Sequence, residues 1–85
     1  MKSLQVKIPW IEGLHARPAS RVVRIARNFS SSIHLRCNQK IANAQSLLSI
    51  LLLSASLGSI IQIEANGEDE DSAIQAVAEL FEAPE

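Results

Sequence analysis

The sequence predicts an α+β fold, an open-faced sandwich in which a four-stranded antiparallel sheet carries three helices on one face, in the order βαββαβα. Short segments with clean alternation of apolar and polar residues are too brief to be buried on both sides, so they favour an antiparallel sheet with one covered face. Segments with helical spacing lie between them and can supply that cover. With 85 residues and no repeat or linker, we expect one domain over residues 1–85.

The first half of the chain predicts a strand, a helix and a hairpin. Apolar residues alternate with polar ones in the first strand, at Leu4, Val6 and Ile8. Gly13 ends the connection that follows, and helical spacing then runs from Ala16 to about Asn28, on Ala19, Val22, Val23 and Ala26. A second alternation from Ser31 to Cys37, followed by the tight turn Asn38-Gln39 and a short strand from Lys40 to Ala42, indicates a hairpin.

The second half predicts a short helix, a strand and a last helix. The helix from Ser46 to Leu53 is apolar nearly all round, so only one of its faces can reach the core. After Gly58, the strand from Ile60 to Ala65 ends at Asn66-Gly67 and points three side chains inward, those of Ile61, Ile63 and Ala65. The last helix opens at Asp69 or Glu70 and has an apolar stripe of Ala73, Ile74, Val77, Leu80 and Phe81. Residues 83–85 are expected to fray.

Charged residues are unevenly distributed, although the formal net charge is only −1. The first helix has a row of arginines, whereas the segment from Glu68 to Glu85 is acidic and holds no lysine or arginine. This polarity favours docking of the basic end against an acidic protein surface. Nucleic acid is not an expected partner, because it would call for an overall basic domain with interleaved aromatic residues. The ordinary meaning of such a row, a solvated helix face, stays open for Arg21, Arg24 and Arg27.

Composition also bears on the compartment and on metals. The most apolar stretch, from Leu47 to Ile63, is interrupted by serines and is shorter than the ~20 apolar residues of a membrane helix, so no membrane partner is expected. The start of the chain lacks the pattern of a signal peptide, and the lone Cys37 cannot form an internal disulfide, so we expect a cytoplasmic protein. Cys37 is interpreted as a small core residue and His34 as a bystander, and no metal site is expected.

The segment Gly13-Leu14-His15-Ala16-Arg17-Pro18-Ala19 carries the chemistry. It puts an imidazole, a guanidinium and free backbone amides at the expected first turn of a helix, where unpaired N–H groups and the helix dipole attract phosphate. Histidine adds a nucleophilic nitrogen that can itself carry a phosphoryl group. Pro18 costs little here, because its missing N–H would have no helical partner. The segment predicts a site that holds phosphate covalently and briefly.

This motif resembles the active-site motif of the HPr family, the histidine-containing phosphocarrier proteins of the bacterial phosphoenolpyruvate-dependent phosphotransferase system. The resemblance continues beyond the motif. Ser46 at the start of a short apolar helix, Gly58 before the fourth strand, and the segment 66–70 before the last helix match the family in position and order. It covers essentially the whole chain, and a run of adjoining motif residues makes it specific.

The resemblance implies a phosphocarrier without a cofactor and without turnover of its own. Such a protein accepts a phosphoryl group from phosphorylated enzyme I on Nδ1 of a histidine and passes it to an enzyme IIA domain. Carried onto this chain, the histidine is His15, Arg17 is the phosphate-stabilising side chain, and the backbone amides of Ala16 and Arg17 donate to the phosphoryl oxygens. We expect the carrier to be a monomer.

A partner surface is expected beside the motif. The short helix has more leucines than it can bury in its own domain, and exposed apolar patches usually mark protein contacts. This docking surface consists of Leu47, Leu48 and Leu51, with Leu52 as a further candidate, bordered by Ser20, Arg24 and Arg27. In the HPr family, a surface with an apolar centre and a basic rim receives both enzyme I and the IIA partners.

Two questions stay open from the sequence. Ser46 is either a helix N-cap or, as in some family members, a serine that HPr kinase phosphorylates to regulate docking. The neighbouring residues depart from kinase-regulated members at Gln45, Ser49, Ser54 and Leu57, and they fit a nitrogen-related carrier about as well as a sugar carrier. An alternative of another class is a regulatory binding module that acts through contacts alone. Retention of both His15 and Arg17 favours the carrier, because a module that only binds needs no nucleophile.

Overall fold

The computed structural model describes residues 1–82 and confirms the predicted α+β open-faced sandwich. Within these residues the order is β1 (Lys2–Lys7), α1 (Ala16–Ala26), β2 (Ser32–Cys37), β3 (Lys40–Asn43), α2 (Leu47–Leu51), β4 (Ile60–Asn66) and α3 (Glu70–Leu80). Every predicted element is present, with ends moved by one to a few residues. α1 and α2 both stop earlier than the apolar pattern suggested. The fraying expected at 83–85 lies outside the described residues.

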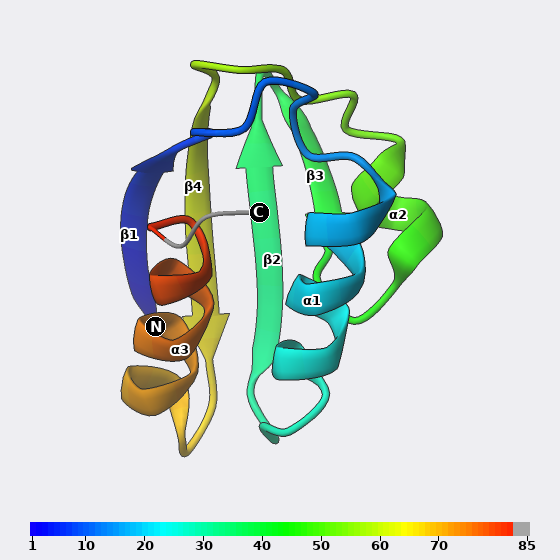
Figure 1. Cartoon of the computed structure of the whole chain (residues 1–85). Coiled ribbons are helices and arrows are strands. Elements are labelled where there is room, and N and C mark those ends of the chain that lie inside the picture. The colour runs from blue at the N-terminus through cyan, green and yellow to red at the C-terminus, as the bar shows by residue number, and fades with distance from the viewer. Residues whose placement is uncertain (83–85) are drawn as a thin grey trace.

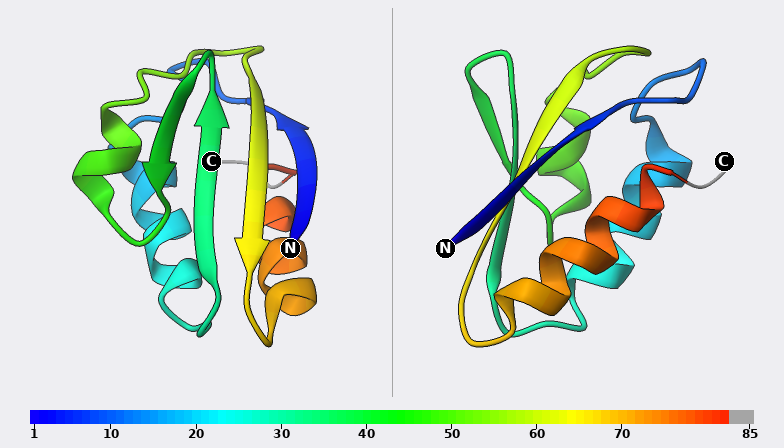
Figure 2. Two further views of the ribbon diagram at one scale, coloured as in Figure 1. Left: turned by 180° about the vertical axis from the view of Figure 1, so that it is seen from behind. Right: turned by 90° about the vertical axis from the view of Figure 1, so that its left-hand side faces the viewer.

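The strands form one antiparallel sheet with the order β1-β4-β2-β3 (Figure 1). In the centre, β2 and β4 pair with Leu35 opposite Ile63. Figure 2 shows the helices gathered on one side of the sheet, which leaves the other face open. The β2–β3 hairpin turns on Asn38 and Gln39, whose φ angles are 50° and 71°. Two consecutive positive φ values are typical of a two-residue hairpin turn of type I′, so the predicted turn is confirmed.

The core lies between the covered face of the sheet and the helices. The alternation read from the sequence decides which side chains enter it, because residues two apart on a strand share a face. The central strands bury Ile33, Leu35, Cys37, Ile61, Ile63 and Ala65. The helices bury Ala19, Val22, Val23 and Ala26 from α1, Ile50 from α2, and Ala73, Ile74, Val77 and Ala78 from α3. The interpretation of Cys37 as a small core residue is confirmed.

The edge strands and the open face are less apolar than the centre. Leu4 faces the helices but is 42% exposed, because β1 is an edge strand with a neighbour on one side only. On the open face, Arg36 Nε lies 3.3 Å from Glu64 Oε2. His34 is half-buried between its register partners on β4 and β3, which fits a bystander. No helix within residues 1–82 is long and apolar enough to cross a bilayer.

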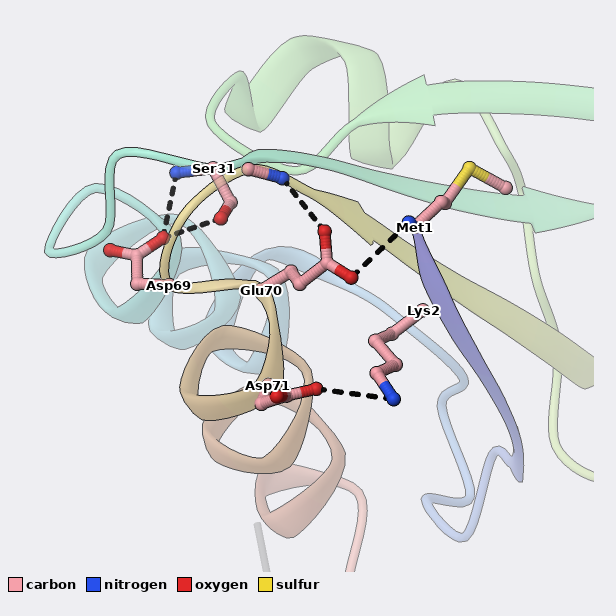
Figure 3. Close-up of polar contacts among 7 residues, drawn as sticks. Met1, Lys2, Ser31, Asp69, Glu70 and Asp71 are labelled. Atoms are coloured by element: carbon pink, nitrogen blue, oxygen red, sulfur yellow. Dashed lines mark hydrogen bonds and ion pairs between the residues drawn. The ribbon is translucent and has the colours of Figure 1, made fainter.

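The start of α3 is tied to the loop before β2 and to the first residues of the chain (Figure 3). The Asp69 carboxylate accepts hydrogen bonds from the Ser30 and Ser31 amides, at 2.9 and 3.0 Å, and from the Ser31 hydroxyl. Glu70 accepts from the Gly67 amide at 3.0 Å and lies 3.2 Å from the Met1 amino group. These bonds lower the pKa of both carboxyl groups, led by the Ser31 hydroxyl at Asp69 and by the Gly67 amide at Glu70.

Candidate functional site: a histidine at the start of α1

The loop before α1 is held against the segment that precedes β4. The Gly13 amide donates to the Trp10 carbonyl at 2.9 Å, and the Leu14 amide donates to the Ala55 carbonyl at 3.0 Å. Gly13 has a φ of 72°, a conformation that glycine adopts without cost. A Cβ at this position would also lie 2.4 Å from the Ala55 oxygen. Only glycine fits this crossing, and the crossing fixes where the chain enters α1.

Aromatic packing anchors the same loop to the core. The Trp10 and Phe81 ring centroids lie 5.3 Å apart with an interplanar angle of 35°. Both side chains are nearly fully buried, as is Leu14 directly before the histidine. Packed aromatic pairs of this kind stabilise beyond the area that they bury. The backbone that presents His15 is therefore rigid on its inner side, which suits a site that must hold one geometry.

His15 is the N-cap residue of α1, with extended φ and ψ angles of −86° and −170°. Its carbonyl accepts the Ala19 amide at 3.0 Å, whereas its side chain makes no capping hydrogen bond to the helix. The imidazole is 28% exposed. Its Nε2 is buried, and its Nδ1 lies 3.7 Å from Oε1 of Glu12. The ring is thus accessible at the surface while one of its nitrogens faces the interior.

The surroundings of this ring favour an anion. The first turn of α1 contains no acidic residue, and Ala16 and Arg17 are both exposed. Pro18 is buried and lacks an N–H, so the amide donors at the helix start are those of the residues before it. The helix dipole adds a partial positive charge, and the Arg17 guanidinium adds a full one. In general, an imidazole nitrogen can attack a phosphoryl group, and amides, a helix dipole and a guanidinium close to it stabilise the charge of that group.

The arginine row continues along α1 towards α2. Arg24 and Arg27 are exposed, and Ser20 is half-buried. Arg27 donates from Nη2 to the Gln45 carbonyl at 3.3 Å, while the Gln45 side-chain amide donates to the Ala26 carbonyl at 3.2 Å. These two bonds join the end of α1 to the residue before the α2 cap. The two helices lie side by side in Figure 1.

The leucines of α2 lie on the surface. Leu47 and Leu51 are 38% and 36% exposed, Leu48 is 67% exposed, and Leu52 just after the helix is 65% exposed. Ile50 is the residue of α2 that fills the core. The Ser46 side chain accepts the Ser49 amide at 3.2 Å, so the N-cap interpretation of this serine is confirmed. The expected excess of apolar side chains therefore forms an exposed patch next to the basic row.

Neither a metal site nor the hollow found within residues 1–82 involves His15. Within residues 1–82, no group of histidine, cysteine and acidic side chains could hold a metal ion. A hollow lined by Lys40, Ile41, Ser49, Leu52 and Leu53 lies between β3 and α2 and does not include His15. The imidazole of His15 is instead partly exposed at the protein surface.

Comparison with known proteins agrees with this geometry. Residues 2–83 match the family model described as "PTS HPr component phosphorylation site". The chain belongs to the HPr family. It is 41% identical to the phosphocarrier protein HPr of Xylella fastidiosa over an aligned region of 70 residues. This region covers 82% of this chain and 79% of that protein. The crystal structure of an HPr from Thermoanaerobacter tengcongensis has a TM-score of 0.92 at 40% identity, covering 96% of this chain and 92% of the other. The chain is an HPr-type phosphocarrier of the phosphotransferase system.

Two further relatives bear on finer points. The chain is 42% identical over 72 residues to the phosphocarrier protein NPr of Proteus mirabilis, covering 84% of this chain and 80% of that protein. Identity alone therefore does not separate the two kinds of carrier. A crystal structure of an HPr dimer from Thermoanaerobacter tengcongensis has a TM-score of 0.77 at 40% identity, covering 96% of this chain and 94% of the other. The expectation of a monomer stays a prediction for this chain.

Sequence reasoning missed two residues beside the predicted ones. Gln45 was noted only as a departure from kinase-regulated members, yet it bonds both Arg27 and Ala26. Glu12 was not singled out at all, although it lies three positions before His15 and its carboxylate faces the imidazole. Spacing gave a signal for Glu12, since residues three apart in a turn or helix can meet. Nothing in the sequence indicated the pairing of Gln45 with α1.

Proposed function

We propose that this chain accepts a phosphoryl group from phosphorylated enzyme I on Nδ1 of His15 and passes it to an enzyme IIA-type protein. One observation carries the proposal: a partly exposed imidazole stands at the N-cap of a helix whose first turn has no acid, with Arg17 two residues on. Nε2 is buried, so Nδ1 is the nitrogen that a phosphoryl donor can approach. The setting is cytoplasmic, where both partners of such a relay would be met.

The transfer follows from this arrangement. The Nδ1 lone pair forms a new N–P bond while the bond between phosphorus and the donor imidazole breaks, and the donor nitrogen leaves with that electron pair. The reaction needs the two nitrogens in line and charge neutralisation on the phosphoryl oxygens. The Ala16 and Arg17 amides and the Arg17 guanidinium supply the neutralisation. Transfer to a IIA-type acceptor is the same step in reverse, with the acceptor histidine as the nucleophile.

Docking uses the exposed leucines of α2 with the basic row of α1. Leu47, Leu48 and Leu51 form the apolar centre, and Ser20, Arg24 and Arg27 form the rim. Both enzyme I and the IIA-type acceptor would use this surface in turn. The arginines steer an acidic partner and raise the encounter rate more than the affinity, which suits a carrier that must dissociate after each transfer.

Phosphate loading tests the proposal directly. Incubation with phosphoenolpyruvate and catalytic enzyme I should raise the intact mass of the chain by one phosphoryl group. The variant His15→Ala should gain none, while His34→Ala, which removes the other histidine of the chain, should load as the unmodified protein does. Loading of His15→Ala, or no loading of the unmodified chain, contradicts the proposal.

The destination of the phosphate has two candidates. A sugar-branch IIA is the first, and the 42% identity to an NPr favours a nitrogen-branch IIA as the second. Mixing the loaded chain with one purified IIA of each kind, and following which acceptor gains phosphate faster, separates the two. We further propose that Ser46 is open to regulation by HPr kinase, because a phosphate there would replace its cap to Ser49 and place charge beside the docking leucines.

A further inference from the structure

Glu12 places a carboxylate at the proposed phosphorylation site. It lies in the turn before α1, and its Oε1 is 3.7 Å from Nδ1 of His15. The Glu12 side chain is 73% exposed, so no packing in the core explains its position. The nitrogen that it faces is the proposed phosphoryl acceptor, since the other ring nitrogen, Nε2, is buried. A carboxylate therefore lies close to the nitrogen to which the phosphoryl group would be bonded.

The sign of this charge is opposite to that of every other charged or dipolar feature of the site. The helix start and the Arg17 guanidinium attract a phosphoryl group, whereas the Glu12 carboxylate repels it. With the imidazole protonated, Glu12 and His15 form an ion pair, and that attraction is replaced by repulsion when Nδ1 carries phosphate. Glu12 thus favours the unloaded carrier over the loaded one.

We propose that Glu12 is a tuning residue that weakens the hold of His15 on its phosphoryl group and so raises the tendency of the loaded carrier to transfer it onward. This inference rests on the proposed phosphorylation of His15. A phosphocarrier must be able both to accept a phosphoryl group and to release it. A site in which every charge attracts the phosphoryl group would favour acceptance and oppose release. Because Glu12 is exposed and can turn towards solvent, it shifts the balance without blocking loading.

The size of the effect follows from Coulomb's law. Like charges on the order of 5 Å apart at a solvated surface repel enough to change an equilibrium constant by roughly three- to tenfold. Salt screens such a pair, with a Debye length of about 10 Å at 0.1 M and about 3 Å at 1 M. A charge effect of Glu12 must therefore shrink at high ionic strength, whereas a purely structural effect would not.

The experiment measures the loading equilibrium. The chain is incubated with catalytic enzyme I and fixed ratios of phosphoenolpyruvate to pyruvate, and the fraction that carries phosphate is read from the intact mass. Glu12→Gln should raise the ratio of loaded to unloaded protein about three- to tenfold at low salt, and the difference should fall at high salt. Glu12→Asp keeps the charge and should stay closer to the unmodified protein.

A matched control removes a carboxylate elsewhere. Glu68 lies just before α3, at the end of the molecule opposite the start of α1 (Figure 1). Glu68→Gln changes net charge equally and should leave the loading ratio unchanged. An equal shift in Glu12→Gln and Glu68→Gln overturns the inference, as does a Glu12→Gln ratio equal to that of the unmodified chain. These outcomes are distinct from failure of the proposed function, in which the unmodified chain takes up no phosphate at all.

Discussion

The starts of α1 and α3 lie at opposite ends of the sandwich and treat negative charge in opposite ways (Figure 1). The first turn of α3 contains Glu70 and Asp71, and the preceding Asp69 bonds the neighbouring loop. The first turn of α1 contains no acid, although the two helices are alike in that neither N-cap side chain makes a capping bond. The carboxylates at the start of α3 bond neighbouring segments and so stabilise the fold. The start of α1 has no such carboxylates in its first turn, so its partial positive charge can attract an anion from outside the protein.

This difference shows how one physical feature serves either stability or function. Every helix start has unpaired amides and a partial positive charge. At α3 the partial positive charge lies beside carboxylates that are close in sequence. The bonds of these carboxylates go to the loop before β2, to the Gly67 amide and to the first residues of the chain (Figure 3). The first turn of α1 contains no carboxylate and includes Arg17 instead. Glu12 is the exception, and it stands outside the helix, in the preceding turn.

The largest expected effect comes from removing the positive charge at the α1 start. Arg17→Ala should slow phosphoryl transfer from enzyme I by about a hundredfold, because it removes one group that stabilises the transferring phosphoryl oxygens. Its effect on thermal unfolding should be small, since Arg17 is exposed. Rapid-quench measurements of transfer and a melting curve test both parts. Arg36→Ala, which removes an exposed arginine from the open face of the sheet, serves as the control and should leave the transfer rate unchanged.

The next effect concerns the docking leucines. Leu47→Asp should weaken the affinity for enzyme I by about tenfold or more, because it places a charge in the apolar centre of the proposed contact. Isothermal titration measures the affinity. Ile60→Asp is a matched control, since Ile60 is 49% exposed on β4 and alternates with the buried Ile61, which puts it on the open face of the sheet and not on the helix-covered face. Equal weakening by both substitutions, or by neither, would mean that the docking surface has been placed wrongly.

Periodicity predicted the fold because each element carries its own pattern. Residues of β2 and β4 alternate strictly, and the buried ones, such as Leu35 and Ile63, are those that the alternation selects. The exposure of Leu48 also followed from counting, since one short helix cannot bury leucines on all sides. The strand order β1-β4-β2-β3 could not be read in this way, because it depends on contacts between distant segments.

The site was predictable where its residues adjoin in sequence and not where separate segments meet. His15 and Arg17 stand in one motif, so their nearness needs no tertiary structure. The Gln45 bonds to α1 arise only when α2 packs against it, and the crossing of Gly13 over Ala55 joins residues far apart in the chain. Ionic contacts such as Glu12 with His15 depend on how a turn orients its side chains, which spacing alone does not fix.

The last prediction concerns the α3 end. The pKa of Asp69 is lowered in the folded protein, chiefly by the Ser31 hydroxyl, so its carboxylate adds stability at neutral pH. This contribution is fully present above the ordinary pKa of an aspartate and is lost as the pH falls through the lowered value. Asp69→Asn should therefore reduce Tm at neutral pH. In strong acid, the difference in Tm between the variant and the unmodified chain should become smaller. Thermal unfolding across a series of pH values measures both.

The reason lies in the donors that Asp69 must satisfy. Its two oxygens accept from the Ser30 amide and from the amide and hydroxyl of Ser31. Asparagine has one acceptor oxygen, so one side of the network would meet an NH₂ group instead, next to the buried Ser31. Phosphoryl transfer should be unaffected, because α1 starts at the other end of the molecule. A fall in transfer without a fall in Tm would mean that the two helix starts are not independent, and that the carboxylates of α3 act on the site of α1.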